Sequence, residues 1–251
     1  MSDIEANFIN GIIRKHKLKT CLEIGVANGG SSILILNAIK DIKNSILVSI
    51  DLFSHVLSDP KHKIGYRVYE YFPELTKNWK LFTGDQPHKF LMGLNIKFDL
   101  LFLDSAHISP GEIINFIEAL PFLKENAIIL VHDLLWHFDK RRRTKYSFYP
   151  SCISLIPAIF GKKIILGYSK STINNIAAIG LYDNQETHYL DYFLLLMNFW
   201  EYMPTDRQIN DLKFFISKYY KKEIFINIFN KAVSKNKQFI NNTIFHKKTK
   251  I

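Results

Sequence analysis

The chain has 251 residues, of which 47% are hydrophobic and 22% are charged, proportions that are typical of a globular protein. They exclude a disordered or collagen-like chain, and the length suits one large domain or one domain with a smaller appendage. The only two cysteines, Cys21 and Cys152, are too few for a disulfide framework. We therefore expect a reducing, cytoplasmic location.

No segment predicts secretion or a membrane span. The N-terminus carries Asp3 and Glu5 where a signal peptide needs basic residues. The most apolar stretch, residues 192–200, is far shorter than the roughly 18 residues that a spanning helix needs. We expect it to be a core helix or a contact between subunits of a homo-oligomer.

The positive charge is unevenly distributed. The net charge is +10, and residues 140–145 read KRRRTK. Such a run can recruit phosphate or nucleic acid, although a solvated basic loop is an equally good interpretation.

Short apolar runs alternate with helical patterns through the first part of the chain, which is typical of a mostly parallel sheet with helices on both faces. Helices are predicted over Asp3–His16, Ser31–Lys40 and Pro110–Leu123, the last with Ser109 as N-cap. The predicted strands, seven in all, are Thr20–Ile24, Ile46–Asp51, Lys80–Phe82, Phe98–Asp104, Ala127–Asp133, Lys163–Tyr168 and Asn175–Tyr182.

The last two predicted strands could pair as a hairpin at the edge of the sheet. From Glu186 onward the chain is helical and aromatic, with a break at residues 203–206 where Thr205 or Asp206 can cap the next helix. We therefore predict an α/β domain over residues 1–184 and a helical C-terminal extension over residues 185–251.

The first three strands end in groups that could bind a nucleotide. The first runs into Glu23 and a glycine-rich turn, residues 25–30, before a helix begins, so free N–H groups face any ligand there. Asp51 ends the second strand, where a carboxylate can accept both ribose hydroxyls. Asp85 follows the third strand and could accept from an adenine amino group. Each feature alone could equally be a tight turn or a cap.

The fourth and fifth strands deliver four polar groups to the same edge. Asp104 and His107 follow the run Leu100–Leu103, and His132 and Asp133 end the next strand. Ligands of open α/β folds bind at this carboxyl edge. Four such residues together favour a functional site over chance.

The sequence resembles the class I S-adenosylmethionine-dependent methyltransferases over residues 18–182. The matching phrases are LEIGVANGGSS, VSID, TGD, FDLLFLDSAH and LPFLKENAIILVHDL. The resemblance is strongest to the bacterial branch of small-molecule and sugar O-methyltransferases related to catechol O-methyltransferase. It implies a Rossmann-like seven-stranded fold, the cofactor S-adenosylmethionine, and cofactor contacts from Glu23, Gly25, Asn28, Gly29, Gly30, Ser31, Asp51, Leu52, Asp85 and Asp104.

The resemblance leaves the need for a metal open. Metal-dependent relatives carry an Asp-Asn pair after the fifth strand, whereas here Asp133 is followed by Leu134. Asp104 and Asp133 are the metal candidates, and the third ligand is missing unless His107 or His132 replaces it. We favour a metal-free route with His107 as general base, because the ordinary pKa of histidine lies near neutrality.

We expect the acceptor to be a small molecule, a sugar or a nucleotide-linked sugar. Residues 134–150 and 53–71 are the expected walls of its site, and the basic residues Lys140–Lys145 could hold a phosphate. Flat surfaces for stacking would come from Trp136, Phe138, Tyr146, Phe148 and Tyr149.

Three other classes of protein share some of these features. An RNA methyltransferase would use the same cofactor domain, but the Asn/Asp-Pro-Pro-aromatic turn of enzymes that act on nucleobase amino groups is missing at Asp104. A dinucleotide-dependent oxidoreductase would need a third glycine in the turn. A non-catalytic cofactor-binding or assembly module would keep the same fold.

Overall fold

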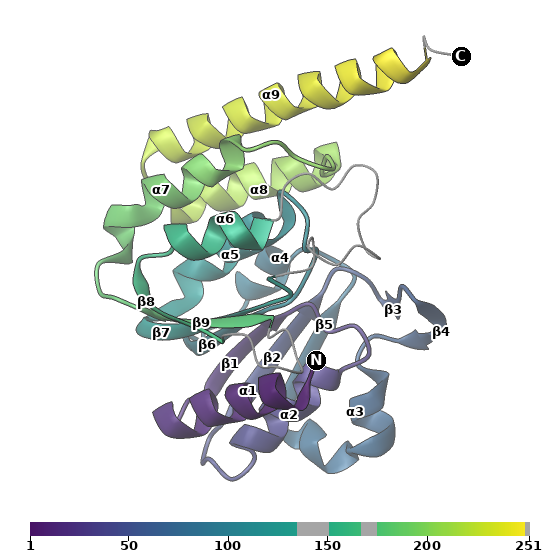
Figure 1. Ribbon diagram of the computed structural model, residues 1–251, viewed down its shortest axis with the longest axis vertical. Helices are drawn as coiled ribbons and strands as arrows, with labels where there is room; N and C mark the ends of the chain where they lie inside the picture. Colours follow the sequence, from purple (N-terminus) through teal and green to yellow (C-terminus); the bar gives the residue numbers. More distant parts are fainter. Residues whose placement is uncertain (135–150, 167–174, 249–251) are drawn as a thin grey trace.

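A twisted seven-stranded sheet lies between two layers of helices in the computed structural model, which describes residues 1–134, 151–166 and 175–248 (Figure 1). The strand order is β5-β2-β1-β6-β7-β9-β8, and every pairing is parallel except the two made by β9. The strands are β1 (Thr20–Ile24), β2 (Ile46–Asp51), β5 (Trp79–Thr83), β6 (Phe98–Leu103), β7 (Leu123–His132), β8 (Gly161–Ile165) and β9 (Ile176–Leu181).

The central strands are apolar along their whole length because helices cover both of their faces. In β6, Leu101 and Leu103 belong to the core on one side of the sheet, and Leu100 and Phe102 belong to the core on the other side. All four are 0% exposed. This alternation fixes the register of β6, since a slip by one residue would exchange the two sets.

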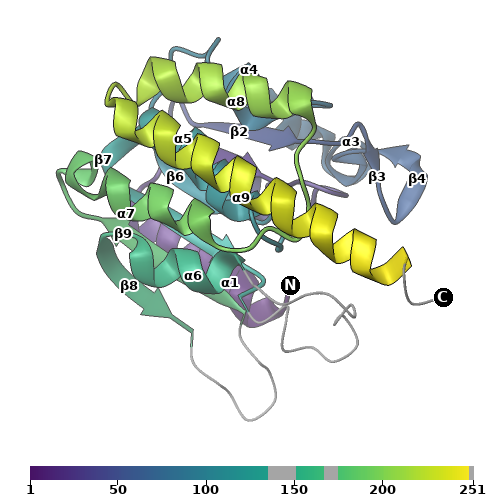
Figure 2. The same ribbon diagram turned by 90° about the horizontal axis from the view of Figure 1, so that it is seen from above.

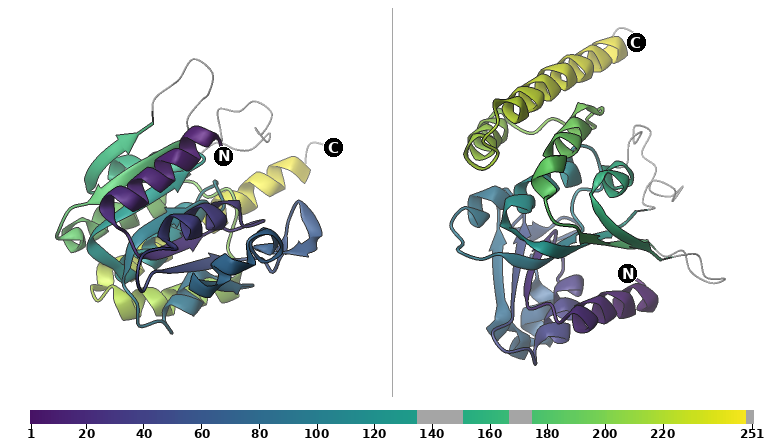
Figure 3. Two further views of the ribbon diagram at one scale, coloured as in Figure 1. Left: turned by 90° about the horizontal axis from the view of Figure 1, so that it is seen from below. Right: turned by 90° about the vertical axis from the view of Figure 1, so that its left-hand side faces the viewer.

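The two helical layers differ in size (Figure 3). One face of the sheet is covered by α1 (Asp3–His16), α2 (Gly30–Ile39) and α3 (Tyr66–Tyr71). The other face carries the remaining helices, among which the long last helix crosses over its neighbours (Figure 2). They are α4 (Pro87–Leu91), α5 (Gly111–Ala119), α6 (Ser151–Ala158), α7 (Tyr189–Leu194), α8 (Asp206–Tyr219) and α9 (Glu223–Lys248).

All seven predicted strands are present, but several of their boundaries differ. Strand β8 is Gly161–Ile165 where Lys163–Tyr168 was predicted, and Tyr168 lies outside the described residues. Strand β7 begins at Leu123 rather than Ala127, because Leu123 already pairs with Phe98 before a register shift in the ladder. Helix α5 is Gly111–Ala119 rather than Pro110–Leu123, and its N-cap is Pro110 and not Ser109, because the carbonyl of Pro110 accepts the bond from the Ile114 amide. The helix ends before Leu123 because Leu123 already belongs to β7. The edge hairpin is formed by β8 and β9, and Thr205 caps α8 in a capping box.

The sequence did not predict the small antiparallel hairpin of β3 (His55–Val56) and β4 (Asp59–Lys63), which projects beside the main sheet (Figure 1). Its strands are short and β4 is mostly charged, so no apolar alternation marks them. Of the predicted wall 134–150, only Leu134 is among the described residues. The aromatic residues predicted for stacking and the basic residues Lys140–Lys145 lie outside them, as does the segment 167–174 between the last two strands.

The C-terminal helices share a core with the sheet. Tyr192, Phe193 and Trp200, within the apolar stretch 192–200, are at most 2% exposed and belong to the same cluster as Leu101 and Ile129 of the sheet. The stretch is thus a core element within the chain. None of the helices in the described ranges has the length and apolar character needed to cross a membrane.

We predict that a chain ending at residue 184 aggregates. Removal of residues 185–251 uncovers the apolar face of α5 on which Tyr192 and Tyr220 pack. Size-exclusion chromatography and thermal unfolding measure this. A chain ending at residue 248 serves as the control and should remain soluble. A soluble, cooperatively folded truncation at residue 184 would contradict the shared core.

Candidate active site

The turn after β1 lies directly on the ends of its two neighbouring strands. The Gly25 amide donates to the carbonyl of Ile50 in β2 at 2.9 Å, and the Asp104 amide donates to the carbonyl of Ile24 at 3.0 Å. Gly25 has a φ of +91°, and a Cβ there would overlap the Asp104 carbonyl and come within 2.9 Å of the Ser105 Cα. Glycine is therefore required at this close approach.

Asp51 fixes the same turn from the end of β2. Its Oδ2 accepts from the amides of Val26 and Ala27 at 2.9 and 3.0 Å, and its Oδ1 accepts from Phe53 at 2.9 Å. The side chain is only 8% exposed and faces the cavity described next. Oδ1 accepts only one of these bonds and keeps a further lone pair, so Asp51 can also accept from a ligand.

A cavity of about 690 Å³ opens above the carboxyl ends of β1, β2, β5 and β6. Of the ten predicted cofactor residues, Gly25, Asp51, Leu52 and Asp104 line it. The predicted wall from residues 53–71 is present as residues 53, 55–58 and 64. The other six predicted cofactor residues do not line it, and these are Glu23, Asn28, Gly29, Gly30, Ser31 and Asp85.

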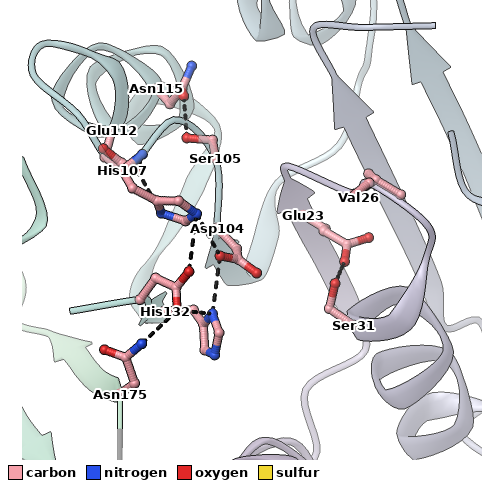
Figure 4. A network of polar contacts seen from close by, with 12 residues as sticks. Glu23, Val26, Ser31, Asp104, Ser105, His107, Glu112, Asn115, His132 and Asn175 are labelled. Atoms are coloured by element: carbon pink, nitrogen blue, oxygen red, sulfur yellow. Dashed lines mark hydrogen bonds and ion pairs between the residues drawn. The ribbon is translucent and has the colours of Figure 1, made fainter. Parts of the chain in front are cut away.

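Glu23 is completely buried beneath the turn. Its carboxylate accepts from the hydroxyls of Ser31, Ser32 and Ser49 at 2.5 to 2.6 Å, of which the Ser31 contact is drawn in Figure 4. Burial raises the pKa of Glu23 to about 7, although the three hydroxyls oppose that rise. In this geometry Glu23 connects β1 to the start of α2 and to β2.

Gln86, and not the predicted Asp85, lines the cavity after the end of β5. The Asp85 carboxylate forms an ion pair with Arg207 at 3.1 Å, outside the cavity. Gln86 lines the cavity, is 8% exposed, and its buried amide oxygen has no hydrogen-bond partner among the residues that the structure describes. A buried acceptor without a partner is costly unless a ligand supplies a donor.

The four predicted catalytic residues form one cluster, of which Figure 4 labels Asp104, His107 and His132. His107 Nε2 lies 3.6 Å from Asp104 Oδ1 and 3.4 Å from Asp133 Oδ2. His132 Nδ1 lies 3.1 Å from Asp104 Oδ1. His107 and Asp133 both have a φ of 55°, and such left-handed backbone is uncommon outside glycine and often marks functional sites.

Acidic neighbours set the charge of the two imidazoles. Burial lowers the pKa of His107, but Glu112, Asp104 and Asp133 together raise it above its ordinary value. For His132, burial again opposes, while Asp104, Asp133 and Glu5 raise the pKa. Each imidazole is therefore held more readily as a cation than a free histidine would be.

Asp104, His107 and Asp133 also form a set of ligand atoms that lie within 4.8 Å of one another. Glu112 lies 3.3 Å from the other ring nitrogen of His107, an arrangement that orients metal-binding histidines in many proteins. The third ligand that the sequence lacked after Asp133 can thus be His107. The donor set fits a divalent cation.

Sequence reasoning missed two distant contributions to the site. Tyr202, Met203 and Pro204, before α8, line the cavity from the side of the C-terminal helices. The side-chain Nδ2 of Asn175 donates to Asp133 Oδ1 at 2.6 Å. The backbone amide of Asn175 donates to Glu5 Oε1 of α1 at 2.9 Å. No local pattern marks these residues, because only the tertiary fold brings them to the sheet edge.

Comparison with known proteins agrees with this geometry. Residues 22–134 match the family model described as a methyltransferase domain. Comparison with curated protein sequences gives no significant match.

Solved structures share the fold at low sequence identity. The O-methyltransferase TomG of Streptomyces achromogenes, which is involved in tomaymycin synthesis and was solved with S-adenosylmethionine, is 17% identical, with 72% of this chain and 81% of that chain covered and a TM-score of 0.54. An O-methyltransferase of Bacillus cereus with S-adenosylhomocysteine is 16% identical, with 72% of this chain and 82% of that chain covered and a TM-score of 0.55. The S-adenosylhomocysteine-bound methyltransferase PaMTH1 of Podospora anserina is 19% identical, with 73% of this chain and 80% of that chain covered and a TM-score of 0.50.

The sheet, its layers and the match over residues 22–134 identify a methyltransferase domain with the class I, Rossmann-like fold. Residues 22–134 are therefore a methyltransferase domain, as the sequence resemblance predicted.

We predict that Glu23→Gln removes a pH-dependent loss of stability. The pKa of Glu23 is about 7 in the fold and near 4.5 when unfolded, so the native state holds the proton more tightly. Wild-type stability then falls as the pH rises from about 4.5 to about 7, and stays level above that range.

The difference in unfolding free energy should therefore shift in favour of Glu23→Gln between about pH 4.5 and about pH 7, as measured by urea titration. Glu125→Gln, at an exposed glutamate, is the matched control and should follow the wild-type profile. A difference between Glu23→Gln and wild type that stays constant with pH would refute the raised pKa.

Proposed function

We propose that this protein binds S-adenosylmethionine in the cavity above β1, β2, β5 and β6 and transfers its methyl group to a hydroxyl of a small-molecule acceptor. The observation that carries the proposal is the position of Asp104. This residue lines the cavity and also contacts His107 and His132, so the ligand site and the acid–base cluster share one wall.

The cavity wall has the chemistry that an adenosyl group needs. Leu52, Phe53 and Ile108 supply apolar surface for a flat base. Asp51 offers a carboxylate to hydroxyls, and Gln86 offers an amide oxygen that no group in the described part of the chain engages. These features support adenosine binding.

The cofactor supplies a methyl group on a positively charged sulfur, which is already activated for attack. In the transfer, the acceptor oxygen forms a bond to the methyl carbon, the carbon–sulfur bond breaks, and the acceptor loses its proton. The protein must align the oxygen and accept that proton. His107 is the proposed proton acceptor at Nε2, with Glu112 beside Nδ1 orienting the ring and with Asp104 and Asp133 stabilising the imidazolium that forms.

A divalent cation at Asp104, His107 and Asp133 would be held by two carboxylates and one imidazole, and would lower the pKa of an acceptor hydroxyl. We favour His107 as the base because the oxygen ligand expected after Asp133 is replaced by Leu134. The chelation experiment below separates the two routes.

The acceptor class that we propose is a small molecule or a sugar, including a nucleotide-linked sugar. Phe53 and Leu57 line the cavity and are 44% and 72% exposed, so they offer apolar surface at its mouth. Such surface suits the face of a ring or a sugar.

We predict that Asp51→Ala weakens binding of S-adenosylhomocysteine by about 10-fold to 150-fold for each ribose hydrogen bond lost, since a hydrogen bond to a charged group contributes about 1.5 to 3 kcal/mol. Isothermal titration calorimetry measures the affinity. Asp41→Ala, at an exposed aspartate, is the control and should bind as the wild type does. Equal affinity in Asp51→Ala would rule out the ribose contact.

We predict that His107→Ala lowers the methyl-transfer rate by about 100-fold to 10,000-fold while cofactor affinity stays unchanged. Because the pKa of His107 is raised, the wild-type rate should increase with pH above the ordinary histidine range and then level off. Screening of hydroxyl acceptors with labelled cofactor provides the assay. His16→Ala, at an exposed histidine, is the control.

Chelation tells the two routes to proton loss apart. With His107 as the base, EDTA leaves the rate unchanged. A rate that EDTA abolishes and that Mg²⁺ or Mn²⁺ restores would instead assign the cluster to a cation.

A further inference from the structure

A chain of buried hydrogen bonds leads from α4 through α5 to the cavity. His88 and Glu118 are both 0% exposed, and His88 Nδ1 lies 2.5 Å from Glu118 Oε1. The other oxygen of Glu118 accepts from Asn115 Nδ2 at 3.0 Å. Asn115 Oδ1 in turn accepts from the hydroxyl of Ser105 at 2.8 Å (Figure 4). Ser105 and Asn115 line the cavity, and none of the roles described above uses this chain of contacts.

The contact between Asn115 and Glu118 sets the direction of the next bond in this chain. The NH₂ group of Asn115 donates to Glu118 Oε2, so it is the side of Asn115 that faces Glu118. The carbonyl oxygen of Asn115 is then forced to face Ser105. The single hydroxyl proton of Ser105 is therefore committed to Asn115, and only the lone pairs of Ser105 remain for a ligand.

The polar side chains of His88 and Glu118 fill a space that is closed to solvent. Burial of two polar side chains carries a desolvation cost that apolar side chains of the same volume would not have. The surroundings of His88 are apolar on at least one side, where the Phe215 ring lies 5.4 Å away between centroids. A role in orienting Asn115 and Ser105 gives the pair a function that apolar residues could not supply.

We propose that His88 and Glu118 are positioning residues that hold Ser105 as a hydrogen-bond acceptor toward the bound cofactor. The group of the cofactor that faces Ser105 is then an N–H or O–H donor. This inference rests on the proposed function, since it takes the cavity to be the site of S-adenosylmethionine.

A double-mutant cycle tests the proposal, with the affinity for S-adenosylhomocysteine measured by calorimetry. Ser105→Ala removes the acceptor and should weaken binding by about 3-fold to 10-fold. Glu118→Gln, whose amide can face Asn115 with either end, should weaken binding to a similar extent. In the variant that carries both changes, the loss should be no larger than in Ser105→Ala alone. Losses that multiply would show that Glu118 acts only through stability and would overturn the proposal.

A second pair of variants guards against misfolding of Glu118→Gln. His88→Asn retains an N–H donor near the position of Nδ1 and should bind like the wild type, whereas His88→Leu lacks the donor and should bind like Ser105→Ala. Equal affinities for the two His88 variants would also overturn the proposal. If the wild type itself fails to bind S-adenosylhomocysteine, the proposed cofactor and this inference fall together. If it binds and the losses multiply, only the inference about Ser105 falls.

Discussion

The contact between Gly25 and the end of β6 is the constraint on which the site depends. Since Gly25 has no side chain, the turn after β1 can rest on the backbone of Asp104 and Ser105. The same turn is tied to β2 through Ile50 and Asp51. Three strand ends are thereby held together at the floor of one cavity, and any larger residue at position 25 would force them apart.

From this floor the site extends in two directions. Toward β5, the wall offers Asp51 and Gln86, which suit the polar edges of a nucleoside. On its other side, Asp104 meets His107, His132 and Asp133, where acid–base chemistry can occur. A donor and an acceptor of a methyl group need this arrangement, because the reacting atoms must meet at the boundary between the two regions.

The strands and the residues at their ends could be predicted because the information is local. Runs such as Leu100–Leu103 indicate a strand that is buried on both faces, and the parallel arrangement places Asp51, Asp104 and Asp133 at one edge. The distinction between Asp85 and Gln86 depends on Arg207, which lies 122 residues further along the chain and pairs with Asp85. No pattern within the TGD phrase could show this.

Contacts that form only in the tertiary fold likewise could not be predicted from the sequence. Tyr202 reaches the cavity because the C-terminal helices pack on the same face of the sheet as α5. The resemblance to methyltransferases ended near residue 182, so it carried no information on this wall. The role of Glu23 also depends on three serine hydroxyls, two of them from α2, that converge on it only after folding.

A crystal structure of the protein soaked with S-adenosylhomocysteine tests the central claim most directly, because it shows where the nucleoside lies without requiring the acceptor. The account predicts electron density in the cavity, with the ribose beside Asp51 and the sulfur on the side of Asp104. Density for the nucleoside outside this cavity, or an empty cavity at saturating ligand, would contradict it.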